Sequence, residues 1–270
     1  LFTCTGDITP SLEILLDFVQ QPYFTKETVQ KEQGIIAQEI QMCNDSPGRR
    51  VLYNLLRGMY HRHPIRIDIA GTLESIAQIT PELLYDCYHT FYNLRNMVLA
   101  VAGNVTVEQV LAVADRLLKP AGNFNMQRVM PDEPREVVTN KVEEVMPVAA
   151  PLFYLGFKRP VTDVVFATGT EAAAAEILLE LVAGKSSKLY ARLMQEGLIN
   201  QKFGAEFFDG PGYGIWLFAG ESKDPEAVSR AIQQEIDQIR QHGFDQSDFE
   251  AARNALYGRM VSGMNDVENC

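Results

Sequence analysis

Glu32 and Glu39 are two carboxylates whose spacing could place them in one metal-binding or catalytic site. They lie about two helical turns apart, so both project from one face if the segment is a helix. Val29, Ile36 and Cys43 continue the same three-and-four spacing, which is typical of an apolar seam facing a core. Acids in such a seam indicate a site where a cation or a catalytic water offsets their desolvation. The alternative is that both acids sit at the edge of the seam and reach water.

The histidines do not complete a metal site with these acids. His61 and His63 belong to a His-Arg-His-Pro run that is more typical of a polar loop than of a metal clamp. His89 is expected to pack among aromatic residues, and His242 is expected near a helix C-terminus, where a partly charged imidazole is favoured. A catalytic zinc needs about three protein ligands. The scattered cysteines form no Cys-x-x-Cys pair and predict no disulfide framework: Cys4, Cys43, Cys87 and Cys270.

A weak internal repeat makes the two glutamates more informative. Ala252 and Arg259 occupy the repeated positions of Glu32 and Glu39, so one copy carries the acid pair and the other does not. Chance similarity between two amphipathic helices is the alternative explanation. The matched segments are residues 1–19 with 217–236, and residues 23–40 with 243–260 at an offset of 220.

Periodicity and capping residues predict alternating helices and strands on both sides of a linker. The proline, glycine and charged residues of segment 119–145 indicate that linker. The extended apolar start at residues 1–4 is typical of the middle of a strand. Helices are expected at residues 11–20, 25–42, 50–60, 81–91, 107–118, 170–182, 187–196, 225–241 and 246–260, and strands at 96–102, 150–158, 203–208 and 214–219.

Composition excludes several classes of protein. The 270 residues carry a formal net charge of −11, which argues against binding to nucleic acid. A hydrophobic fraction of 46% suffices for a core, and we expect neither disorder nor a membrane span of about 20 apolar residues. No secretory signal pattern opens the chain, and we expect a cytoplasmic protein.

Several segments resemble the pitrilysin/insulinase-type zinc metallopeptidases, in their bacterial two-domain branch. The most specific are PYFTKETVQKEQGIIAQEIQM and the run from HPIRIDIAGTLESIAQITPELL to NMVLAVAGNV. GKSSKLYARLMQEGLIN resembles part of that family's second domain. The resemblance implies an α+β fold with a duplicated domain, each copy an antiparallel-rich sheet with helices packed on one face, as in mitochondrial processing peptidase. We expect both copies to be truncated.

The resemblance also implies a site. Such enzymes bind zinc through an inverted H-x-x-E-H motif on one helix and a glutamate on a later helix. Glu39 would be that last zinc ligand, and Glu32 the acid that orients the site. The H-x-x-E-H segment, with the glutamate that activates the zinc-bound water, is not in this sequence, and we expect it upstream of Leu1. A substrate-binding arginine of the family would fall on Leu193, so Arg192, one residue out of register, is only a weak candidate for contact with the substrate backbone.

These features predict a fragment of a zinc endopeptidase that cleaves peptides in a two-half chamber. We expect the fragment to be inactive, to bind no zinc, and to pair in the intact protein with a homologous subunit or with itself. The alternative is a non-catalytic scaffold or peptide-binding subunit. The expected division is the back part of a zinc-site domain at 1–125, a linker at 126–145 and the front part of a non-catalytic copy at 146–270.

Overall fold

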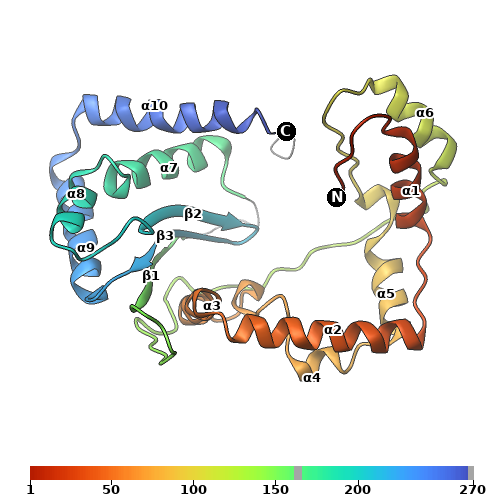
Figure 1. The fold of residues 1–270 in the computed structure, drawn as a ribbon, viewed down its shortest axis with the longest axis horizontal. Coiled ribbons are helices and arrows are strands. Elements are labelled where there is room, and N and C mark those ends of the chain that lie inside the picture. The colour runs from red at the N-terminus through yellow and green to blue at the C-terminus, as the bar shows by residue number, and fades with distance from the viewer. Residues whose placement is uncertain (161–165, 267–270) are drawn as a thin grey trace. The chain divides into compact units, whose positions relative to one another are not determined.

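A computed structural model describes residues 1–160 and 166–266 of the chain (Figure 1). The described residues form helices and one three-stranded sheet, so the predicted α+β class is confirmed. The first elements are α1 (Thr9–Gln20), α2 (Lys26–Asn44), α3 (Pro47–Met59), η1 (Pro64–Arg66), α4 (Leu73–Ile76), α5 (Pro81–Phe91), η2 (Leu94–Asn96) and α6 (Val107–Leu117). They are followed by β1 (Leu152–Lys158), α7 (Gly169–Ala183), α8 (Lys188–Gln195), β2 (Gly204–Gly210), β3 (Tyr213–Glu221), α9 (Pro225–His242) and α10 (Gln246–Gly263).

The chain divides into two compact units whose boundaries differ from the sequence-based division. One unit contains residues 1–39, 72–128 and 263–270, and the other contains residues 40–71 and 129–262. The second unit therefore includes α3, which the sequence analysis placed in the first domain. The assignment of a zinc-site copy and a non-catalytic copy remains a prediction.

The first unit is built from helices that pack pairwise. Leu12 and Leu16 of α1 pack against Val113 and Ala114 of α6, and all four side chains are buried. The Tyr88 hydroxyl on α5 donates to the Val19 carbonyl at 2.7 Å, which joins α5 to α1. Apolar stripes at helical spacing therefore account for this packing.

The second unit is organised around an antiparallel sheet in the order β1-β3-β2. Phe153 of β1 pairs in register with Gly220, and Phe207 of β2 pairs with Trp216 of β3. One face of the sheet packs on α7, α8 and α9, where Leu189, Leu193, Phe218, Val228 and Ile232 are almost completely buried. This face holds the largest cluster of buried apolar side chains in the described residues.

Helix α3 covers the opposite face of that sheet. Leu56, Met59 and Tyr60 pack with Ile215 and Leu217, whose side chains alternate with those that face α7–α9. The approach is close at Gly156, where a Cβ atom would lie 2.8 Å from the Met59 sulfur. The sheet thus carries helices on both faces, whereas the resemblance implied helices on one.

Two strand predictions are wrong. Residues 97–102 form no strand, and the Val98 side chain is 94% exposed. Residues 1–4 are also irregular. A strand is stable only when a neighbouring strand satisfies its backbone hydrogen-bonding groups. No described residue of the first unit belongs to a strand, so no such partner is present there. Apolar composition alone could not supply that partner.

The other predicted elements match their positions to within a few residues, whereas the short helices η1, α4 and η2 were not predicted. The predicted linker contains neither helix nor strand over its described length, residues 119–145. Ile8 holds the N-cap position of α1 without a side-chain hydrogen bond. Among the described helices, none has both the length and the apolar character needed to cross a bilayer.

Candidate metal centre

The two candidate acids lie together on helix α2. Thr25 caps this helix, with its hydroxyl accepting from the Thr28 amide at 3.2 Å, and the helix then runs unbroken past both acids. Seven residues rotate the helix to roughly 20° short of two full turns, so Glu32 and Glu39 project from one face. The predicted shared face is thus present.

The predicted burial of that face is wrong, because Glu32 and Glu39 are both exposed. The buried side chains of α2 are Val29 and Ile40, and the acids lie on the flank of the face that these two residues define. Gln33 anchors the helix beside this face, since its side-chain amide donates to the carbonyls of Ile76 and Ile79 at 2.8 and 2.9 Å. The two acids thus share a face, but the buried stripe of α2 is centred on Val29 and Ile40.

The described residues contain no group of three or more His, Cys, Asp or Glu side chains that could hold a metal ion. A glutamate oxygen is a donor that zinc accepts, but Glu39 by itself provides too few ligands. The structure of this chain therefore does not complete the zinc site that the resemblance implies.

The side chains of His63, His89 and His242 contact other groups of the chain. His63 is 4% exposed, and its Nδ1 accepts from the Ile65 amide at 3.1 Å while its Nε2 lies 3.0 Å from the Pro211 carbonyl. His89 is exposed beside Tyr85, and His242 ends α9 with its Nδ1 3.2 Å from the Gln238 carbonyl. Cys4, Cys43 and Cys87 are free thiols, and Cys270 lies outside the described residues.

The second copy shows what packs against the face equivalent to that of the two acids. Ala252 on α10, the counterpart of Glu32, is 4% exposed. Arg259, the counterpart of Glu39, donates to the Glu180 carboxylate on α7 at 2.8 Å. The repeated face of α10 is therefore directed at helix α7.

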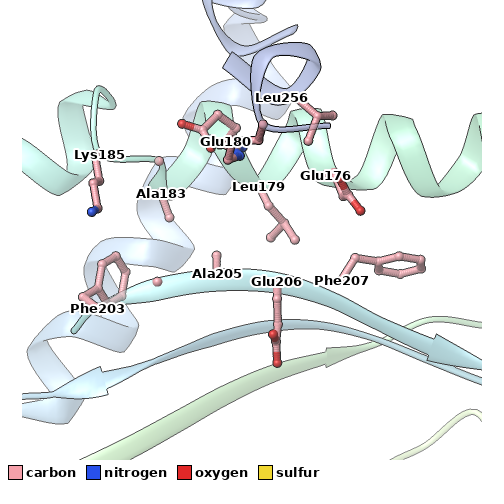
Figure 2. A pocket seen from close by; sticks show the side chains of 13 residues that line it. Glu176, Leu179, Glu180, Ala183, Lys185, Phe203, Ala205, Glu206, Phe207 and Leu256 are labelled. Atoms are coloured by element: carbon pink, nitrogen blue, oxygen red, sulfur yellow. Dashed lines mark hydrogen bonds and ion pairs between the residues drawn. The ribbon is translucent and has the colours of Figure 1, made fainter. Parts of the chain in front are cut away.

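A cavity of about 600 Å³ beside this contact is lined by residues of α7, β2 and α10 (Figure 2). Leu179 of α7 points toward Ala205 of β2 across it, and Glu206 points to the other side of the sheet. Leu256, the counterpart of Ile36, lines the cavity from α10 together with Arg259. Positions 36 and 39 of the first copy thus correspond to positions that face α7 in the second.

Arg192 is accessible to solvent, whereas Leu193, which takes the position of the family's substrate-binding arginine, is not. Arg192 is exposed on α8 with a guanidinium nitrogen 3.8 Å from the Glu235 carboxylate, whereas Leu193 is fully buried in the core. Leu193 therefore packs the second unit. Any contact of Arg192 with a substrate remains a prediction.

Sequence reasoning missed the most buried ion pair in the described part of the chain. The Lys158 ammonium lies 2.8 Å from the Glu133 carboxylate, and the two side chains are only 7% and 9% exposed. The Glu133 carboxylate also accepts from the amides of His61, Arg62 and His63 at 2.7–2.8 Å. Burial alone would raise the pKa of Glu133, but Lys158 and these three amides lower it to about 2.

Comparison with known proteins identifies the family. A family model described as "Peptidase M16 inactive domain" matches residues 78–256, and one described as "Insulinase (Peptidase family M16)" matches residues 3–73. The chain belongs to the M16 peptidase family. Glu32 and Glu39 lie within the segment matched by the insulinase model, and the described sheet lies within the segment matched by the inactive-domain model.

Relatives in the M16 family support the same fold. The chain is 38% identical over 239 residues to the uncharacterized zinc protease YmfH of Bacillus subtilis, covering 86% of this chain and 55% of that protein. The solved structure of a putative M16-like peptidase from Alicyclobacillus acidocaldarius superposes with a TM-score of 0.88 at 36% identity, covering 98% of this chain and 63% of that one. The chain thus spans a little over half the length of these relatives.

A less similar relative is named as a subunit of a larger assembly. Subunit 1 of the human mitochondrial cytochrome b-c1 complex is 30% identical over 113 residues, covering 42% of this chain and 23% of that subunit.

Proposed function

We propose that this M16 chain contributes one zinc ligand, Glu39, and one supporting acid, Glu32, to a zinc-dependent endopeptidase. The remaining ligands and the catalytic glutamate are supplied by an H-x-x-E-H helix outside the 270 residues. The observation that carries the proposal is the contact of α10 with α7, because the repeat then suggests that a helix equivalent to α7 packs on the corresponding face of α2.

The proposal follows from the repeat in two steps. Helix α10 directs Leu256 and Arg259 at α7, and α2 carries Ile36 and Glu39 at the same positions. By analogy, α2 corresponds to α10, and a further helix would take the place of α7. That helix would therefore lie against both Glu32 and Glu39. In the family that the chain resembles, the helix at that place carries H-x-x-E-H. Exposure of the two acids agrees with a face that receives residues from outside the chain.

The 270-residue chain by itself is expected to be inactive. Its described residues offer no metal site with three ligands, and its sequence contains no H-x-x-E-H. We expect metal analysis after dialysis to find no stoichiometric zinc in this chain and peptide hydrolysis to stay at background. Stoichiometric zinc that survives dialysis would contradict the proposed division of the site.

The main experiment uses the full-length protein with Glu39→Gln, Glu32→Gln and, as a control, Glu27→Gln. Glu27 is an exposed acid of α2 that lies away from the face of the two candidates. We expect Glu39→Gln to lose bound zinc and peptidase activity, and Glu32→Gln to weaken zinc binding about 10- to 100-fold. Glu27→Gln should retain both properties.

The same experiment separates the peptidase from a non-catalytic subunit. If the full-length protein binds no zinc, or if Glu39→Gln leaves zinc and activity unchanged, the peptidase proposal fails and the scaffold alternative is favoured.

We also propose that the full-length protein pairs with a homologous subunit or with itself, and that its substrates are peptides. Sedimentation of the purified protein as a monomer at working concentration would contradict the self-pairing form of this proposal.

A further inference from the structure

We propose that residues 133–148 form a strap with one fixed end and one releasable end, and that the strap covers an apolar cavity of the second unit. This inference concerns only the unit that contains residues 40–71 and 129–262, and it does not depend on the proposed zinc site.

The fixed end of the strap is the buried pair of Glu133 and Lys158. The Lys158 ammonium donates to the carbonyls of Met59 and Pro134 at 2.9 and 2.7 Å, and it lies 4.6 Å from the centre of the Tyr60 ring. With the Glu133 carboxylate at 2.8 Å, each of its three protons has an acceptor. Because both charges are buried and fully paired, dissolved salt has little access to this end.

The middle of the strap is held by the backbone. The amides of Val138 and Thr139 both donate to the Gly58 carbonyl of α3, at 2.8 and 3.0 Å. Methyl groups of Thr139 and Val142 lie 3.5 Å from the place that a Cβ atom at position 58 would take, which is ordinary contact distance, so the strap packs directly on this turn of α3.

The releasable end is held by exposed charges. The Glu144 carboxylate accepts from Arg50 Nε at 3.0 Å and from Asn54 Nδ2 at 2.7 Å, both on α3. The Lys141 ammonium donates to the Glu226 carboxylate of α9 at 2.6 Å. The paired side chains are 31–64% exposed, and such pairs are weak and are screened by salt. Beyond them, Val145 is 100% exposed and contributes no apolar anchorage.

The cavity beneath the strap has a volume of about 890 Å³. Its floor is formed by the faces of α3 and β1, and the strap and the start of α9 complete the walls. The apolar residues of the floor are Val51, Leu55, Met59, Leu152 and Tyr154. Release of the 141–148 end opens this floor to solvent while the Glu133 end stays in place.

The test measures how fast a thiol in the floor reacts. Leu55→Cys is introduced into the chain, and its alkylation is followed by peptide mass spectrometry, which distinguishes it from the native cysteines. We expect Glu144→Gln to accelerate the reaction about two- to fivefold at low salt, the range that loss of an exposed ion pair produces. Raising the salt from about 0.05 to 0.5 M should accelerate the alkylation of Leu55→Cys to a similar extent when the strap carries Glu144. The acceleration by salt should be smaller when the strap carries Glu144→Gln.

Glu221→Gln is the matched control, because Glu221 also pairs with one cation and one amide, Lys202 and Asn200, at 2.6 and 2.7 Å. It should leave the reaction of Leu55→Cys unchanged. A second reporter, Leu189→Cys in the fully buried core, detects opening of the whole unit.

Three results would overturn the proposal. The first is no effect of either Glu144→Gln or salt on Leu55→Cys. The second is a parallel acceleration at Leu189→Cys, which would mean that the unit opens as a whole. The third is reaction of Leu55→Cys as fast as the exposed Cys4 in the unsubstituted chain, which would mean that the strap does not cover the floor.

Discussion

The Glu133 carboxylate is held by more polar partners than that of Glu32 or Glu39. Its carboxylate accepts from three consecutive amides and from Lys158. Since its pKa falls from the ordinary 4.5 to about 2, the folded state favours the charged form. Its contribution to stability is therefore complete above about pH 4.5 and is lost as the pH falls toward 2.

Glu133→Gln should lower the free energy of unfolding by about 3 kcal/mol at pH 7, the equivalent of the pKa shift. The difference from the unsubstituted chain should shrink as the pH falls from about 4.5 toward 2, because Glu133 of the unsubstituted chain is protonated first in the unfolded state and then in the folded state. Urea denaturation at several pH values measures it. Glu136→Gln, an exposed acid of the same segment, should change little. A difference that does not vary with pH would contradict this account of the pair.

The sequence predicted part of the residue-scale picture. The shared face of Glu32 and Glu39 follows from helical spacing. Their correspondence in sequence to Ala252 and Arg259 follows from the repeat. Their exposure does not, because amphipathic spacing fixes a stripe only to within about one residue. The Glu133–Lys158 pair has no local signature, since its partners meet only when the linker lies against β1.

At the scale of elements, α3 packs on the sheet of the second unit although nearly a hundred residues separate α3 from β1 in the chain. Leu56 of α3 is 2% exposed and packs with Ile215 and Leu217 of β3. Short-range patterns correctly predicted this helix but could not indicate the sheet that it covers. The failed strand at 97–102 shows the same limit, because pairing depends on a distant partner.

Leu56→Ala should therefore destabilise the second unit by about 2–5 kcal/mol, as cavities in packed cores do. Trp216 of β3 is the only tryptophan in the chain and reports unfolding of this sheet by fluorescence. Leu12→Ala, an equally buried leucine in the first unit, should lower the Trp216 midpoint less if the units unfold separately. A loss below about 1 kcal/mol for Leu56→Ala would show that α3 does not stabilise the sheet.

At the scale of the whole molecule, the two units carry repeated helix pairs with different residues on the equivalent face. In the second copy this face is occupied by α7, with Arg259 on Glu180. In the first copy it carries two exposed acids. Membership of the M16 family and the repeat together support the proposal that Glu39 binds zinc only when a further helix packs on α2.

The most direct test is a crystal structure of the full-length protein with anomalous scattering recorded at the zinc edge. The account predicts one zinc peak within bonding distance of a Glu39 carboxylate oxygen, with two histidines of a helix outside these 270 residues as the other protein ligands and Glu32 close by without binding the metal. A zinc peak remote from Glu39, or no zinc peak in an active preparation, would contradict it.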